Sequence, residues 1–102
     1  MLNSNYKEIF KLKHLLDIND IPYEIEIGYF NGAVIAYPDN VNTICSAIEH
    51  DGSYGHSADT IEIMGLLTEK EKIHGEVVGY LTAEDVFSRI KTHYERGFRN
   101  EW

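Results

Sequence analysis

The stretch that decides the fold is YEIEIGYFNGAVIAYPD, residues 23–39. Apolar and polar residues alternate on both sides of Asn31-Gly32. An Asn-Gly pair favours the two-residue type I′ turn of a β-hairpin, because both of its residues adopt positive φ. The pattern therefore predicts two antiparallel strands, with Phe30 paired with Ala33.

This register distributes the side chains over two faces. The face expected to join the core carries Ile25, Ile27, Tyr29, Val34 and Ala36. The opposite face is half acidic and half apolar, which is unusual for a fully solvated surface. We therefore expect a partner to cover it, with candidate interaction residues Glu24, Glu26, Phe30, Ile35 and Tyr37.

Three further strands are expected downstream. NTICSAIE (42–49) and TIEIMGLL (60–67) alternate in the same way, and EVVGYL (76–81) is a candidate fifth strand. Between the last two predicted strands, residues 68–71 match the sequence pattern of a helix capping box, and Gly75 would end that short helix.

Helical spacing of apolar residues appears at both ends of the chain. Residues 5–18 carry one wide apolar stripe, and Asn5 with Glu8 predicts its capping box. Residues 82–85 would cap a second helix, which we expect to end at Gly97. Its apolar stripe is Val86, Phe87, Ile90 and Tyr94.

The expected fold is a single α+β domain spanning residues 1–102. Short connections between consecutive strands favour an antiparallel sheet of four or five strands, with the N- and C-terminal helices packed on one face. A chain of this length buries roughly 60% to 70% of its unfolded surface, so one core is sufficient.

The net charge of −8 is unevenly distributed. Residues 17–85 hold 14 acidic and two basic residues, whereas the segments before and after them each carry a net charge of +2. An acidic middle repels phosphate backbones, so direct binding of nucleic acid is not expected. We expect the interior carboxylates to gather on the sheet face that the helices leave uncovered.

The compartment is expected to be a reducing cytoplasm. Cys45 is the single cysteine, so no intramolecular disulfide can form. The N-terminus lacks the features of a secretory signal, and no apolar run approaches the roughly 20 residues of a membrane span.

HDGSYGHSAD, residues 50–59, is longer than most hairpin loops and contains metal-ligand side chains. Candidate ligands are His50, Asp51, His56 and Asp59, but their spacing matches no standard metal motif. The alternative is an ordinary polar loop, so no metal or cofactor is assigned. Tyr54 is a candidate contact residue, because tyrosine provides rigid contact area.

No catalytic signature is found. Cys45 with His50 would need to lie within hydrogen-bond reach to act as nucleophile and base, and a small buried cysteine is the favoured interpretation. The eight glycines are scattered singly and form no phosphate-binding loop.

ICSAIEHDGSYGHSADTIEIMGLL (44–67) together with VVGYLTAEDVFSRI (77–90) resembles small uncharacterised proteins encoded by phages and prophages of Gram-positive bacteria. The resemblance implies a phage accessory protein acting in the cytoplasm of a bacterial host. It carries over no site residue.

Three functions follow as hypotheses. The first is a non-enzymatic acidic interaction or inhibitor protein that uses the acidic sheet face or residues 50–59 to bind a host macromolecule. A basic nucleic-acid-binding protein is one such partner, because carboxylates can be presented in place of phosphates. The second is small-ligand or metal binding at residues 50–59, with hydrolytic chemistry. The third is a homodimer through the half-apolar sheet face. The alternative to all three is that the charge only maintains solubility.

Overall fold

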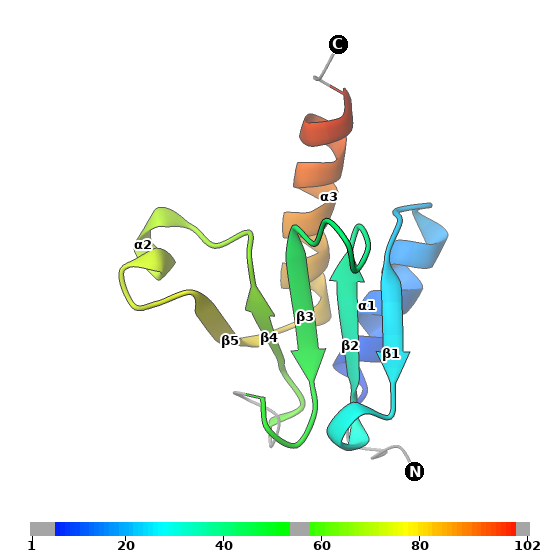
Figure 1. The fold of residues 1–102 in the computed structure, drawn as a ribbon, viewed down its shortest axis with the longest axis vertical. Helices are drawn as coiled ribbons and strands as arrows, with labels where there is room; N and C mark the ends of the chain where they lie inside the picture. Colours follow the sequence, from blue (N-terminus) through cyan, green and yellow to red (C-terminus); the bar gives the residue numbers. More distant parts are fainter. Residues whose placement is uncertain (1–5, 54–57, 100–102) are drawn as a thin grey trace.

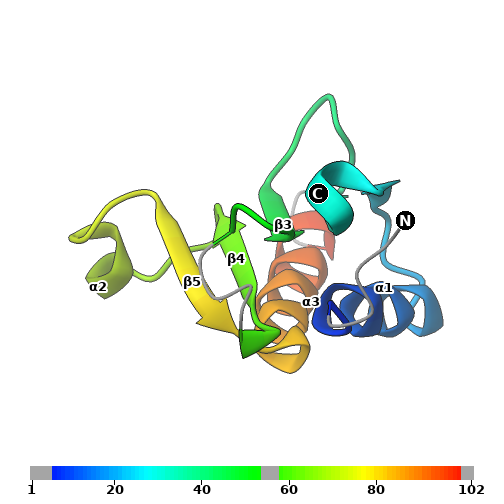
Figure 2. The same ribbon diagram turned by 90° about the horizontal axis from the view of Figure 1, so that it is seen from below.

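Five antiparallel strands form one open sheet in the order β1-β2-β3-β4-β5, and two long helices lie against one face of it (Figures 1 and 2). The computed structural model describes residues 6–53 and 58–99. In chain order the elements are α1 (Glu8–Ile18), β1 (Glu24–Ile27), the 3₁₀ turn η1 (Tyr29–Asn31), β2 (Ala33–Tyr37), β3 (Cys45–Glu49), β4 (Ile61–Met64), α2 (Glu69–Lys72), β5 (Val77–Leu81) and α3 (Ala83–Arg99). The predicted α+β arrangement is confirmed, and residues 76–81 provide the fifth strand.

The core lies between the sheet and the two helices, which run side by side on the same face (Figure 2). The fully buried side chains of α1 recur every three or four residues, at Ile9, Leu12 and Leu16. They pack with Val86 and Ile90 of α3, which are also fully buried. Each such side chain stabilises the fold by about 1.5–3 kcal/mol, so the terminal helices hold the domain together.

The β1–β2 hairpin differs from the predicted one. Ile27 pairs with Ala33, so residues 28–32 form a five-residue connection that contains η1 instead of a two-residue turn. Within this connection Gly28 adopts a positive φ of +96°, and Phe30 and Asn31 also have positive φ. The turn needs a residue with conformational freedom at its start, and Gly28 meets that need.

Gly32 has a different role, because it is the point of closest approach between the hairpin and β3. A Cβ atom there would lie 1.8 Å from the carbonyl oxygen of Glu49. Only a residue without a side chain allows β2 to pair with β3 at this point. The register of three strands therefore depends on Gly32.

The change of register reverses the two faces of β2. A shift by an odd number of residues moves every side chain of a strand to the other face. Ile35 and Tyr37 are therefore core residues with no exposed surface, and the prediction that they belong to an interaction surface is wrong. Val34 and Ala36, expected in the core, lie on the opposite face. The observed register is favoured because it buries the two larger side chains.

The N-terminus of α1 is not capped as predicted. Asn5 lies outside the described residues, and Lys7, the N-cap residue, makes no side-chain cap. The Asp59 carboxylate instead accepts hydrogen bonds from the backbone N–H groups of Lys7 and Glu8, at 2.8 and 3.3 Å. Glu8 Oε1 in turn accepts the N–H of Ala83, at 2.8 Å, so the start of α1 caps the start of α3.

α3 begins where the sequence predicts and ends later than predicted. Thr82 Oγ1 accepts the N–H of Asp85, and Asp85 Oδ2 accepts the N–H of Thr82. The helix passes through Gly97 and ends at Arg99, so Gly97 does not end it as predicted. A glycine costs a helix only about 1 kcal/mol, which the stripe of buried residues outweighs.

Residues 65–76 form an arm that leaves the sheet after β4 and returns to it at β5 (Figure 1). It contains α2, whose capping box of Thr68 and Glu71 is the predicted one. Arg89 of α3 holds the arm: its guanidinium donates to both Glu71 carboxylate oxygens at 2.7 Å, and to the Leu66 carbonyl at 3.0 Å. The arm is therefore fixed to α3 through a half-buried, bidentate ion pair.

We expect Gly32→Ala to lower the free energy of unfolding by about 3 kcal/mol, the upper end of the cost of over-packing. Gly28→Ala is the matched control. No atom lies within 4 Å of a Cβ built there, so only the strain of positive φ remains, about 1–2 kcal/mol. Urea denaturation of both variants measures the difference. Equal losses would contradict the role given to Gly32.

We expect Arg89→Ala to release the arm while the sheet and α3 stay folded. Amide hydrogen exchange at Lys72, whose N–H bonds the Thr68 carbonyl, should accelerate because a charged hydrogen bond contributes about 1.5–3 kcal/mol. Glu69→Gln is the control. It removes an exposed pair with Lys72 at 3.4 Å, which contributes little. Unchanged exchange in Arg89→Ala would show that the ion pair does not hold the arm.

Candidate functional site: the uncovered face of the sheet

The sheet face opposite α1 and α3 carries two rows of side chains set by the strand register. One row runs across the sheet from Glu24 through Ala36, Ser46 and Met64 to Val77, and the next runs from Glu26 through Val34 and Ile48 to Glu62. We call these nine residues the bare face. Figure 2 shows both long helices on the other side of the sheet.

The bare face mixes carboxylates with accessible apolar side chains. Glu24 and Glu26 are exposed and Met64 retains 51% of its surface, whereas Val34 and Ile48 are half-buried. Neither Glu24 nor Glu26 takes part in an ion pair with another described residue. Such a surface offers an apolar centre with acidic groups beside it, which is the composition of many protein interfaces.

Residues 38–44, between β2 and β3, cover one end of this surface. In Figure 2 they rise on the side of the sheet opposite the helices. Glu24 Oε1 accepts the backbone N–H of Asn40 at 2.7 Å, and Ala36 is only 5% exposed. The accessible part of the bare face is therefore centred on β3 and β4 and on the row that begins at Glu26.

The expectation that the interior carboxylates gather on this face is only partly met. Three of them do, at Glu24, Glu26 and Glu62. Others form ion pairs with cations of the terminal helices: Lys11 with Glu84, Lys13 with Asp17, and Arg89 with Glu71. Opposite charges attract most strongly at such short range, so the basic ends of the chain neutralise part of its acidic middle.

The remaining predicted contact residues fall in different places. Phe30 is 61% exposed, and its ring centroid lies 5.4 Å from that of His50. Tyr37 is buried on the face of the sheet that the helices cover. Its hydroxyl forms a 2.7 Å hydrogen bond with His93 Nδ1. Tyr54 lies outside the described residues.

The metal-ligand candidates of residues 50–59 make contacts within the fold. His50 is 9% exposed, and its Nδ1 accepts the Gly52 N–H at 3.0 Å. Asp51 accepts hydrogen bonds from the Tyr6 hydroxyl at 2.5 Å and from Asn31 Nδ2 at 2.7 Å. His56 lies outside the described residues. Within residues 6–53 and 58–99, no group of three or more histidine, cysteine or acidic side chains is arranged to hold a metal ion.

Asp59 interacts with a buried glutamate, Glu49, that is not among the predicted site residues. Glu49 is fully buried at the end of β3, and its Oε1 accepts the N–H of Ile9 at 2.9 Å. No described group donates a hydrogen bond to its other carboxylate oxygen, Oε2. Alternation along β3 places Glu49 on the same face as Cys45 and Ala47, so the pattern already indicated a buried position.

The contact between the Glu49 and Asp59 carboxyl groups is favourable when one of them carries a proton. Burial, and the neighbouring carboxylate of Asp59, raise the pKa of Glu49 to about 8. For Asp59, burial acts to raise the pKa, but hydrogen bonds from Glu49 and from the N–H groups of Lys7 and Glu8 outweigh it and lower the pKa. A proton on Glu49 that is donated to Asp59 satisfies both groups. The start of α1 therefore rests on one protonated and one ionised carboxyl group.

Cys45 is a buried, free thiol, as predicted. Burial raises its pKa to about 12, so the unreactive thiol form is present at neutral pH. Cys45 begins β3 and His50 follows its end, which separates them by roughly 16 Å at about 3.3 Å per residue. The structure does not bring this pair together as a nucleophile and base.

None of the described helices has the length and apolar character needed to cross a membrane. Comparison with protein-family models, with curated proteins and with solved structures gives no match.

We expect the stability of the protein to fall as the pH rises from about 4.5 to about 8. In this window the folded state holds a proton on Glu49 that the unfolded chain releases, and each pH unit costs up to about 1.4 kcal/mol. Glu49→Gln keeps an acceptor for Ile9 and a donor for Asp59 but cannot ionise, so its stability should change much less over this range. Thermal melting at several pH values measures both slopes.

The control is Glu95→Gln, which removes a carboxylate from an exposed position on α3. It should retain the pH dependence of the original protein. If Glu49→Gln also retained that dependence, the proton would not reside on Glu49.

Proposed function

We propose that this chain is a non-enzymatic interaction protein that binds a positively charged partner protein at the bare face. The observation that carries the proposal is the placement of Glu24, Glu26 and Glu62 beside accessible apolar side chains, on the one sheet face that neither long helix covers. Acidic groups steer a basic partner to the surface, and the apolar centre stabilises the complex once water leaves.

The chain's charge favours a protein partner over a nucleic acid. With a net charge of −8, the surface repels phosphates. The same carboxylates can occupy sites that a basic protein otherwise uses for phosphate groups. Together with the resemblance to phage-encoded proteins, this supports an accessory or inhibitor protein that binds a host nucleic-acid-binding protein in the bacterial cytoplasm.

Ligand or metal binding at residues 50–59 is less well supported. His50, Asp51 and Asp59 already accept hydrogen bonds from the backbone or from neighbouring side chains. A metal ion would have to compete with these contacts, which connect the loop to α1 and η1.

We expect Glu26→Lys to weaken partner binding about tenfold at low salt, because the reversed charge repels a basic surface. The measurement starts with affinity capture from a Gram-positive bacterial lysate. The captured protein is then identified, and its dissociation constant is measured at low and moderate salt. Affinity for the original chain should fall steeply as salt increases.

Glu95→Lys makes the same change in net charge on α3, away from the bare face, and should bind nearly as well as the original chain. Equal affinity of both variants, or affinity independent of salt, would refute the proposed interface. Sedimentation distinguishes the remaining case. A dimer dissociated by Glu26→Lys would show that the bare face joins two copies of this chain instead.

A further inference from the structure

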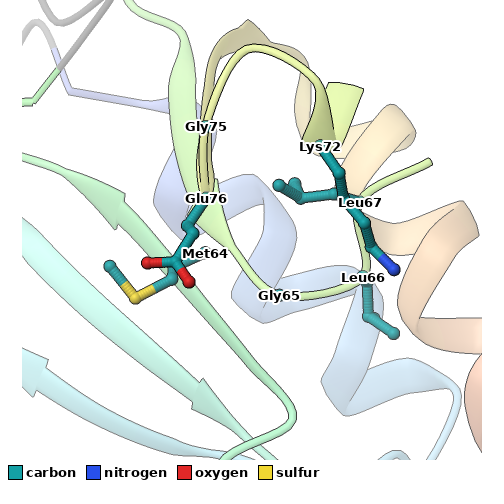
Figure 3. A pocket seen from close by; sticks show the side chains of 7 residues that line it. All are labelled: Met64, Gly65, Leu66, Leu67, Lys72, Gly75 and Glu76. Carbon is teal, nitrogen blue, oxygen red and sulfur yellow. The ribbon is translucent and has the colours of Figure 1, made fainter. Parts of the chain in front are cut away.

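The arm and the end of β4 line an open pocket of about 460 Å³ beside the bare face (Figure 3). Its apolar walls come from Met64, Leu66 and Leu67, and the backbone of two glycines completes them. Figure 3 shows Leu67 extending into the space between the two limbs of the arm. The volume falls within the range of roughly 300–1,000 Å³ typical of sites that enclose an organic ligand or side chain.

The pocket is held open by contacts that do not depend on an occupant. Gly65 and Leu66 both adopt positive φ, at +93° and +58°, and turn the chain sharply out of β4. A Cβ on Gly65 would lie 2.1 Å from the carbonyl oxygen of Ile44, so this turn is packed tightly against the chain before β3. On the far side, Arg89 fixes both Leu66 and Glu71. A preformed pocket lowers the entropic cost of binding.

Charged groups lie at the rim of the pocket. Glu76 and Met64 lie on one side of it and Lys72 on the other in Figure 3. Glu76 adds a carboxylate on the side that faces the sheet. The Lys72 ammonium forms an ion pair with Glu69 at 3.4 Å. A cationic group next to an apolar occupant would therefore meet the Glu76 carboxylate on the sheet side of the rim, away from Lys72.

Met64 connects the pocket to the bare face. It lines the pocket and also stands in the row that contains Ser46 and Val77. A polypeptide lying across β3 and β4 on the bare face therefore reaches the pocket without leaving the surface. The bare face and the pocket therefore form one continuous contact region, with the carboxylates of the bare face and Glu76 beside it.

We propose that this pocket receives an aromatic side chain of the basic partner, flanked in the partner's sequence by lysine or arginine. The inference rests on the proposed function and specifies the partner segment that this face recognises. Aromatic anchors in preformed apolar pockets provide a large share of the affinity at protein interfaces. The flanking cations then pair with Glu76 and with the carboxylates of the bare face.

The test uses two synthetic pentapeptides and the isotope-labelled protein, observed by NMR. One peptide has a central tryptophan between two pairs of lysines, and the other has alanine in place of tryptophan. Both should shift the amide signals of Glu26 and Glu62. Only the tryptophan peptide should shift those of Gly65, Leu67 and Gly75, and it should bind about tenfold more tightly.

The peptide results test the pocket and the bare face separately. If both peptides shift the bare face alone with equal affinity, the pocket proposal is overturned and the acidic interface remains. If neither peptide shifts either region, both proposals fail. A third peptide with tryptophan between glutamates should not bind, and binding as tight as that of the lysine peptide would overturn the requirement for a basic partner.

A variant that fills the pocket provides an independent test. Leu67→Trp places an indole in the pocket itself. It should abolish the tighter binding of the tryptophan peptide relative to the alanine peptide. Ile73→Trp is the matched control, because Ile73 is 78% exposed and does not line the pocket. It should bind both peptides like the original chain. An unchanged tenfold advantage in a folded Leu67→Trp protein would overturn the assignment.

Discussion

The contact between Gly32 and the carbonyl group of Glu49 is the constraint on which the arrangement of the sheet depends. It fixes how β2 pairs with β3 and, through the hairpin, how β1 pairs with β2. These pairings decide which side chains enter the core and which form the bare face. The proposed function therefore depends indirectly on a position that contacts no partner.

The order and type of the elements could be predicted from the sequence because each rests on a local pattern. Alternation identified the strands, helical spacing identified α1 and α3, and the Thr68–Glu71 capping box identified α2. Glu24 and Glu26 were also placed on the correct side, since β1 alternates strictly. Local signals were sufficient wherever one strand or helix could be read on its own.

The errors arose where two segments distant in sequence decide the outcome. Asn31-Gly32 is the dipeptide typical of a tight turn, but the glycine at position 32 is required by a neighbour 17 residues away, Glu49. Ile35 and Tyr37 moved into the core as a consequence. Likewise, Asp59 resembled a metal ligand in a polar loop, whereas it caps a helix that begins more than 50 residues earlier. Sequence spacing carries no information about such contacts.

The caps of α1 and α3 also determine when the chain can fold. The helix α1 needs carboxyl groups from Glu49 and Asp59, and its Glu8 accepts the N–H of Ala83, 75 positions later. A nascent chain therefore cannot complete this core until α3 has emerged. Long-range closure of this kind slows folding relative to helical proteins of similar size, and it makes the domain an all-or-none unit during synthesis.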